Sequence, residues 1–412
     1  MFARTRRAVK RVFLIVPLLA ASLPGVAADA AYPGAALRAL HANTNTGTAT
    51  AVVVADVPLA HTMQMFPITD GKLTAPGDAE KQAQQLLLNL SAALREARSD
   101  LGRAVKLNVF VTSAGHVEAV QRALAKYFDD AHKPAVSFVE TALPVPGVLV
   151  AIDAVAVSDA SAPAGAVNYF RTADIGGAKS LAHAAVLPAG RKVFISGQAE
   201  KGTNLTDSTT RTLQSLEATL KHLELTRAHI VQIKSFFSSM ANMAAVEKGF
   251  AEFFKGGTIP PLVFVEWNST VPIEIELIAA AGAPTGKEPD AIEFITPPGM
   301  KPSPVYAKVA RVNRGRLVYV SSLYSPEHRN ATTQVREVFG ELRKLMQEAG
   351  GDLKHLAKAT YYVSAADVSK ALNDIRPDYY DPQRPPAASK AQVRGVAMPH
   401  RTFTMDMIGV VP

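Results

Sequence analysis

The sequence of 412 residues contains no cysteine. This absence excludes a disulfide framework, a catalytic thiolate and a lipid-attachment cysteine. Charged residues make up 19% of the chain and hydrophobic residues 48%, a balance typical of a globular protein rather than a disordered one. The fold must therefore be stabilised by its hydrophobic core.

Common site motifs are missing as well. The ten histidines include no HExxH pattern and no close pair at the spacing of metal ligands. There is no P-loop and no GxGxxG fingerprint, and Ser196 lies in ISGQA, which is not the GxSxG elbow of an α/β-hydrolase. The sequence predicts neither a metal site nor a cofactor.

The N-terminal 30 residues have the three-part pattern of a secretory signal peptide. A basic start precedes the apolar run VFLIVPLLAASL and then small residues, with cleavage after Ala28 or Ala30. The alternative is an uncleaved membrane anchor, which is disfavoured because the apolar run is short and ends at Pro24. We expect residues 1–28 to be a signal peptide and the mature protein to be periplasmic or secreted.

Removing residues 1–28 takes away five positive charges, so the formal net charge falls from +8 to +3. The basic character is thus mainly a property of the signal, and it gives little support for nucleic-acid binding. We predict a small-molecule ligand, no nucleic-acid partner, and no membrane association after signal cleavage.

The rest of the chain contains three copies of one unit. The segment at 231–254 recurs 126 residues earlier, at 105–128, and 126 residues later, at 357–380. Each copy opens with an alternating apolar run, passes through a turn of small residues and becomes an apolar helical stripe that ends in an aromatic pair. This period is long enough for a domain with its own core.

Each copy is predicted to fold in the order ββαβαββ. Two linkers without apolar periodicity, 158–166 and 282–290, separate the copies. The predicted copies span 44–157, 167–282 and 291–412. In the first, we expect strands at 51–55, 61–66, 107–111, 136–140 and 148–157, and helices at 81–97 and 117–128.

Strands interleaved with two long helices favour an α+β fold in which each copy forms a β-sheet covered on one face by two helices. The other face of each sheet must also be buried. We expect the three uncovered faces to pack on one another around a pseudo-threefold axis, so that a monomer is an intramolecular pseudotrimer.

Short motifs in these copies resemble the RidA/YjgF family of reactive-intermediate deaminases, and their order recurs over nearly all of residues 44–412. The resemblance implies a chorismate-mutase-like fold that normally forms a homotrimer with ligand clefts at its interfaces. Here one chain would supply all three subunits. The motifs are FISGQ at 194–198, VKLNVFV at 105–111, PAVSFVE at 134–140, IEIELIA at 273–279 and PSPVYAKV at 302–309.

In deaminases of this family, an arginine after a Pro-Ala pair holds the substrate carboxylate through paired hydrogen bonds. That position falls on Val136, Leu262 and Ala388, so no copy keeps the arginine. Arg394 is a candidate replacement in substrate binding, because it lies six residues past Ala388 on the same face of a regular strand. The alternative is a solvated arginine at a strand end.

The same resemblance implies a glutamate on the last strand that helps to position water. That position falls on Ala151, Glu274 and Thr404, so copy two alone keeps the carboxylate. Glu274 is therefore the predicted catalytic residue. The alternative is a charged residue on the outer face of an alternating strand.

Three further residues are candidates for substrate binding. A glutamine follows the Ser-Gly pair of the family, and Gln64 and Gln198 occupy this position in copies one and two, whereas copy three has Leu323. Their alternative role is a strand-end amide that caps a loop. Tyr306 matches the tyrosine of the Pro-Tyr segment, with core packing as its alternative.

Two functions remain open from the sequence. One is an exported, divergent deaminase or hydrolase of small imine or enamine metabolites, working in clefts between the copies. The other is a catalytically inactive scaffold that binds a small molecule or a protein and has lost the carboxylate-anchoring arginine.

Overall fold

The computed structural model describes residues 36–128, 133–284, 289–327 and 329–412. The predicted signal peptide lies outside these described residues. Residues 35–412 form one unit by their mutual contacts, so the copies are not separate bodies.

Each copy contributes two helices, and the first of each pair begins at a side-chain cap. Asp78, Asn204 and Asn330 are spaced 126 residues apart, and each accepts a hydrogen bond from the backbone N–H three residues later. The predicted helices 81–97 and 117–128 are confirmed to within two residues. The helices are α1 (Ala79–Glu96), α2 (Val117–Tyr127), α3 (Leu205–His222), α4 (Met243–Phe253), α5 (Ala331–Ala349) and α6 (Ala366–Ile375).

The described residues form three six-stranded sheets and one small hairpin, β4 (Ile68–Thr69) with β5 (Lys72–Leu73). The first sheet has the order β7 (Ala135–Glu140), β6 (Ala104–Val111), β8 (Val150–Val157), β3 (Leu59–Thr62), β10 (Ala184–Leu187), β9 (Asn168–Phe170). The second has the order β13 (Leu262–Glu266), β12 (Ile230–Phe237), β14 (Ile273–Ala280), β11 (Lys192–Gln198), β16 (Val309–Val312), β15 (Ile292–Ile295). The third has the order β1 (Leu37–Leu40), β2 (Ala51–Val54), β17 (Arg316–Val320), β20 (Phe403–Val411), β18 (Leu356–Val363), β19 (Ala387–Gln392).

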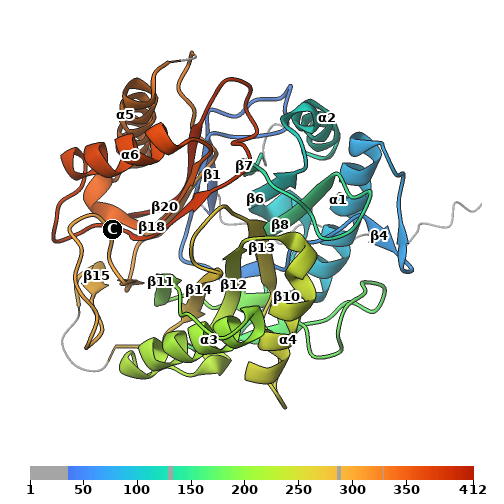
Figure 1. Ribbon diagram of the computed structural model, residues 1–412, viewed down its shortest axis with the longest axis horizontal. Helices are drawn as coiled ribbons and strands as arrows, with labels where there is room; N and C mark the ends of the chain where they lie inside the picture. Colours follow the sequence, from blue (N-terminus) through green and yellow to red (C-terminus); the bar gives the residue numbers. More distant parts are fainter. Residues whose placement is uncertain (1–35, 129–132, 285–288, 328) are drawn as a thin grey trace, which may run out of the picture. The chain divides into compact units, whose positions relative to one another are not determined.

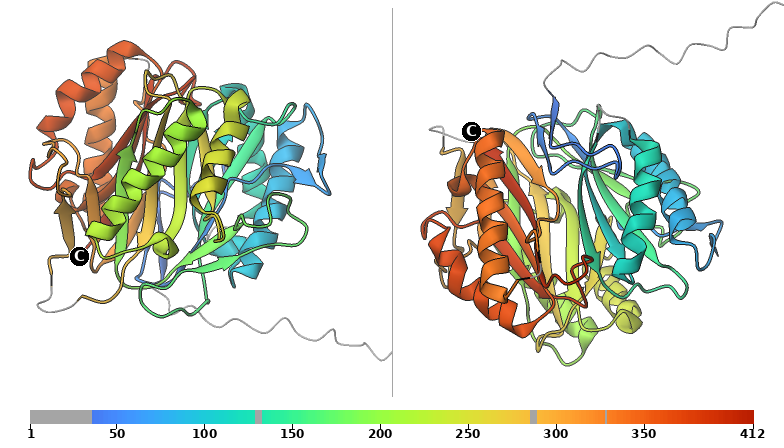
Figure 2. Two further views of the ribbon diagram at one scale, coloured as in Figure 1. Left: turned by 60° about the horizontal axis from the view of Figure 1, so that its bottom comes forward. Right: turned by 90° about the horizontal axis from the view of Figure 1, so that it is seen from above.

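A helix pair covers one face of each sheet, as the α+β prediction requires. Figures 1 and 2 show α1 and α2 against the first sheet, α3 and α4 against the second, and α5 and α6 against the third. Each pair buries an apolar stripe on its sheet; in copy one, Leu87, Leu90 and Leu94 are fully buried in one hydrophobic cluster with strand residues. Each of the other two helix pairs forms a similar hydrophobic cluster with its sheet. These three clusters are the cores that the helical spacing predicts.

The first strands of each copy pair with the sheet of a different copy. β10 pairs with β3 of copy one, although the next strand, β11, belongs to the second sheet. β16 of copy three likewise pairs with β11 of copy two, and β2 of copy one pairs with β17 of copy three. All three copies therefore take part in this exchange of strands. Copy two adds strands to the sheet of copy one, copy three to that of copy two, and copy one to that of copy three.

This exchange differs from the expectation that each copy forms a whole sheet by itself. The helix-covered sheets are confirmed, but each one is divided between two copies. The physical reason is that three similar copies present similar strand edges, so an opening strand fits the edge of a neighbouring copy as well as its own. Hydrophobic periodicity fixes which face of a strand is buried but not which edge it joins.

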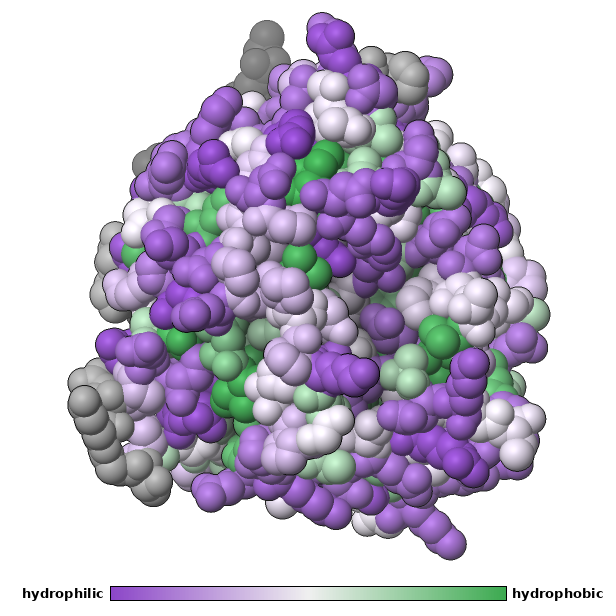
Figure 3. Space-filling view, turned by 60° about the vertical axis from the view of Figure 1, so that its left-hand side comes forward, coloured by the Kyte–Doolittle hydropathy of each residue, from purple (hydrophilic) through white to green (hydrophobic). Residues whose placement is uncertain are grey.

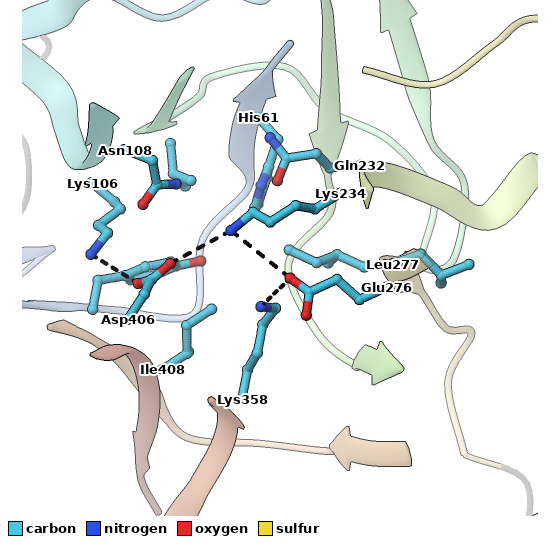
Figure 4. Close-up of a pocket in the computed structure, with 13 residues that line it drawn as sticks. His61, Lys106, Asn108, Gln232, Lys234, Glu276, Leu277, Lys358, Asp406 and Ile408 are labelled. Carbon is cyan, nitrogen blue, oxygen red and sulfur yellow. Dashed lines mark hydrogen bonds and ion pairs between the residues drawn. The ribbon is translucent and has the colours of Figure 1, made fainter. Parts of the chain in front are cut away.

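The uncovered faces of the three sheets supply a buried ionic cluster (Figure 4). Lys106 Nζ lies 2.9 Å from a carboxylate oxygen of Asp406, and Lys358 Nζ lies 2.7 Å from one of Glu276. Lys234 Nζ lies between these carboxylates, 3.7 Å from Asp406 and 3.9 Å from Glu276. All five side chains are buried, and they come from all three copies. The ionic cluster thus connects the copies through charge.

The charges in the ionic cluster are strongly coupled. Burial alone would raise the pKa of Asp406, but the nearby ammonium groups, Lys106 first, lower this pKa to about 2. Burial raises the pKa of Asp153, which borders the cluster, to about 6. A cavity of about 30 Å³ lies among these side chains, enough for about one water molecule.

Aromatic residues from equivalent positions meet beside the ionic cluster. Phe110, Phe236 and Tyr362 are spaced 126 residues apart, and they belong to one buried apolar cluster with Trp267. The contacts between the copies are therefore both ionic and apolar. The pseudo-threefold symmetry of the three copies stays a prediction.

The face seen in Figure 3 is mainly hydrophilic, with hydrophobic side chains in separate spots. Over the described ranges, the exposed large hydrophobic side chains are Leu88, Tyr127 and Met398. No helix in the described part of the chain is long and apolar enough to cross a membrane.

Removing one cation from the ionic cluster should destabilise the whole fold. We expect Lys358→Met to lower the free energy of unfolding by about 3 kcal/mol, because it leaves the buried Glu276 with a weaker partner. Guanidinium unfolding followed by circular dichroism measures this loss. The control is Lys370→Met, whose partner Asp374 is exposed, with an expected loss below about 1 kcal/mol.

The double variant Lys358→Met, Glu276→Leu should recover much of the lost stability, since an apolar pair removes the uncompensated charge. Equal unfolding midpoints for Lys358→Met and Lys370→Met would contradict the importance assigned to the ionic cluster.

Candidate functional site

Strand register places the three glutamate positions at equivalent points of the sheets. Glu274 lies opposite Phe236 on the neighbouring strand. Ala151 lies opposite Phe110, and Thr404 opposite Tyr362, and these three aromatic residues are spaced 126 residues apart. The alignment of the last strands is therefore confirmed, and copy two alone carries a carboxylate at this point.

Glu274 lies where copy two meets copy three. Its carboxylate lies directly over Gly197 of β11, since a Cβ atom built on Gly197 would be 2.0 Å from Glu274 Oε1. From β19 of copy three, the hydroxyl of Ser389 hydrogen-bonds to Glu274 and accepts the backbone N–H of Gly197 at 3.1 Å. The absence of a side chain at position 197 thus makes room for the carboxylate.

Two lysines lie close enough to Glu274 to favour its ionised form. Lys308 Nζ donates to the hydroxyl of Tyr306 at 2.7 Å and lies 4.4 Å from the centre of the Tyr306 ring. Lys390 Nζ donates to Ser369 Oγ at 3.0 Å. We use the name Glu274 cluster for the set Gly197, Glu274, Tyr306, Lys308, Ser389 and Lys390.

The titration of Glu274 is shifted towards neutral pH. Burial, and then the nearby Glu276, raise the pKa of Glu274 to about 7, against the opposing effects of Ser389, Lys308 and Lys390. A carboxyl group with this pKa can give and take protons near pH 7. Burial and the charge of Arg376 lower the pKa of Lys390.

The predicted binding residues lie in different places. Tyr306 belongs to the Glu274 cluster through its contact with Lys308. Gln198 donates to Thr219 Oγ1 of α3 at 2.8 Å, so its side chain is directed to the helix layer. Gln64 Nε2 donates to the carbonyl of Phe264 at 3.1 Å, and this amide therefore joins copy one to β13.

Arg394 does not lie in the Glu274 cluster. Its guanidinium is about half exposed and lies 3.7 Å from a carboxylate oxygen of Glu266. Strand β19 ends at Gln392, before Arg394, so the regular alternation that would carry this side chain to the face of Ala388 does not extend that far.

Sequence reasoning missed Lys308, Ser389 and Lys390. A signal for Lys390 was present, because it lies two residues past Ala388 and so on the same face of the strand. Nothing in the sequence connects Lys308 to Glu274, since that neighbourhood depends on β16 joining the second sheet. No group of three or more His, Cys, Asp or Glu side chains in the described part could hold a metal ion.

Comparisons with known proteins agree with this architecture. The family model described as endoribonuclease L-PSP matches residues 50–158, 175–281 and 300–411. A RutC family protein, slr0709 of Synechocystis, is 44% identical over 81 residues, which are 20% of this chain and 62% of that protein. The match thus spans less than two thirds of that relative. Protein HMF1 of Saccharomyces cerevisiae is 33% identical over 91 residues, 22% of this chain and 70% of that protein.

Among solved structures, the conserved Rid-family protein YyfB of Yersinia pestis is 25% identical, with a TM-score of 0.26, covering 30% of this chain and 98% of that one. A YjgF-family protein of Neisseria meningitidis is 19% identical, with a TM-score of 0.23, covering 29% and 95%. Because the family model matches most of the chain in three successive segments, this chain belongs to the endoribonuclease L-PSP family, that of the RidA and YjgF proteins, and carries three copies of its domain.

Proposed function

We propose that the chain is a divergent deaminase or hydrolase of small imine or enamine metabolites, with the Glu274 cluster as its active site. The observation that carries this proposal is a partly buried carboxyl group with a pKa of about 7, held between two copies beside two lysines. Perturbed carboxyl groups of this kind are typical of acid–base catalysis.

In the proposed reaction, ionised Glu274 accepts a proton from a water molecule as that water attacks the carbon of a protonated imine. The products are a ketone and ammonium, so that R₂C=NH₂⁺ and H₂O give R₂C=O and NH₄⁺. Glu274 returns its proton to the leaving nitrogen. Lys308 and Lys390 would hold an anionic substituent of the substrate in place of the lost arginine. Each ammonium group would act as a single point charge, without the paired hydrogen bonds that a guanidinium makes.

The second candidate function is a binding scaffold without catalysis. Val136, Leu262 and Ala388 at the arginine positions favour it, because no copy keeps the paired hydrogen bonds to a carboxylate. Such a scaffold would bind a small molecule or a protein.

We also propose that the protein is exported after cleavage of residues 1–28. We propose as well that it acts as a monomer, in which the three copies take the place of the three subunits of a homotrimer. The basic and apolar start of the chain supports export. The closed strand exchange supports the monomer, since the opening strands of every copy already have a partner edge.

Replacing the carboxyl group of Glu274 distinguishes between the two candidate functions, a deaminase and a binding scaffold. We expect Glu274→Gln to lower the rate of ammonia release from freshly generated 2-iminoacids by about 100-fold or more, because it removes the proton acceptor. Spontaneous hydrolysis is subtracted, and Glu252→Gln, on the exposed face of α4, should match the parent. If the parent releases ammonia no faster than buffer, the deaminase proposal fails and the scaffold remains.

The pH dependence of kcat/KM should follow the ionisation of Glu274. A base with a pKa of about 7 is protonated and inactive at low pH, so kcat/KM should rise about tenfold per unit below pH 6 and level off above pH 8. A rate that instead falls as pH rises through 7 would identify a general acid and contradict the proposed role.

The lysines should act on binding more than on chemistry. We expect Lys308→Met and Lys390→Met each to raise KM for a carboxylate substrate by about tenfold with a smaller change in kcat. Lys370→Met, on the exposed face of α6, is the matched control. Unchanged KM in both variants would show that the carboxylate is held elsewhere.

A further inference from the structure

The small cavity of about 30 Å³ within the ionic cluster is lined by side chains of all three copies (Figure 4). Its lining includes the three lysines of the cluster and the carboxylates of Glu276 and Asp406, all of them buried. None of the described residues that line it belongs to the Glu274 cluster. This cavity is therefore distinct from the candidate active site.

Lys234 is the lysine of the ionic cluster that lacks hydrogen bonds. Its ammonium group has three N–H donors. Within the described residues it makes only ion-pair contacts, at 3.7 Å to Asp406 and 3.9 Å to Glu276, which are too long for direct hydrogen bonds. Lys106 Nζ, by contrast, donates to Ser137 Oγ at 2.6 Å. Because a buried donor without an acceptor is costly, the cavity beside Lys234 should hold an acceptor that the protein does not supply.

Two more donors border the same cavity. Tyr319 of β17 lines it, is 2% exposed, and has no hydrogen-bond partner for its hydroxyl in the described part of the chain. Lys358 Nζ donates to Glu276 and to Thr360 Oγ1, both at 2.7 Å, which leaves one of its three N–H groups for another acceptor. Donors of copies two and three therefore surround one small space.

The charge of the lining favours an anion as the acceptor. Three lysines face two carboxylates, and His61, which also lines the cavity, is neutral at pH 7 because burial lowers its pKa to about 4. The lining is thus formally one charge positive. The volume admits a water molecule or an ion of similar size such as chloride, and it is too small for a carboxylate or phosphate group.

Asp153 determines whether this positive charge is compensated. It lies outside the lining, accepts a hydrogen bond from Asn108 at 2.9 Å, and has no partner for its Oδ2 atom within the described ranges. Burial raises the pKa of Asp153 to about 6, so this carboxyl group takes up a proton in mildly acidic solution. The titratable groups on the strands packed against it are Lys106 on β6, His61 on β3, Lys234 on β12 and Asp406 on β20.

We propose that this cavity is a binding site for one chloride ion, which accepts hydrogen bonds from Lys234, Lys358 and Tyr319. Chloride and a proton on Asp153 bind together, because the proton removes a negative charge that would otherwise repel the anion. When Asp153 is ionised, a water molecule fills the cavity instead. This site does not depend on whether the Glu274 cluster is catalytic.

Bromide tests the site directly, because it replaces chloride and scatters X-rays anomalously. Crystals grown with sodium bromide at pH 5.5 should show an anomalous peak between Lys234 and Tyr319. Crystals grown with sodium gluconate, whose anion is too large for the cavity, should show a water molecule there. A water molecule in both crystals overturns the proposal.

Thermal unfolding measures the coupling to the proton, in buffers whose ionic strength is kept constant with sodium gluconate. We expect chloride to raise the unfolding temperature, with an affinity about tenfold or more higher at pH 5.5 than at pH 7.5. Asp153→Asn should bind chloride at pH 7.5 as tightly as the parent does at pH 5.5, since the amide carries no charge. An affinity that is equal at both pH values, or higher at pH 7.5, contradicts the proposal.

Tyr319→Phe distinguishes anion binding from a structural role. The hydroxyl has no partner among the described residues, so its removal should leave the unfolding temperature in gluconate unchanged and weaken chloride binding about fivefold. Lys370→Met, whose side chain is exposed on α6, is the control and should keep the chloride affinity of the parent. Equal stabilisation of the parent and Tyr319→Phe by chloride would refute the assigned site.

Discussion

The exchange of opening strands between copies is the constraint on which the rest of the structure depends. Each sheet needs strands from two copies, so no copy can complete its sheet alone. Because the strands of copy one return to the sheet of copy three, the chain forms a closed set of pairings. The uncovered faces are thereby held opposite one another, and the buried lysines and carboxylates can meet there.

The same exchange builds the candidate sites. β16 of copy three joins the second sheet, which brings Lys308 to the neighbourhood of Glu274. β19 of copy three supplies Ser389 and Lys390 to the same place. A site assembled from two copies requires them to keep their register. The geometry of the candidate site is therefore tied to the stability of the interface rather than to one copy.

Three interfaces in one chain are free to differ, which is impossible in a symmetric homotrimer. Between copies two and three, a carboxyl group lies near two lysines. Between copies one and two, Gln64 uses its amide to bond the backbone of Phe264, so this interface is joined by a structural contact. Between copies three and one, a cavity of about 560 Å³ has no Lys, Arg, Asp or Glu among the described residues that line it. Because the copies are fused in one chain, each interface can carry different residues.

The sequence by itself determined the repeat, the helix-covered sheets and the special position of Glu274, because these depend on periodicity and on strict spacing along the chain. It could also have identified Lys390, through its two-residue separation from Ala388. Only the tertiary structure decided that Gln198 serves the helix layer, that Arg394 lies outside the cluster, and which copy each opening strand joins. The physical reason is that three similar copies offer similar strand edges, and local sequence cannot distinguish among them.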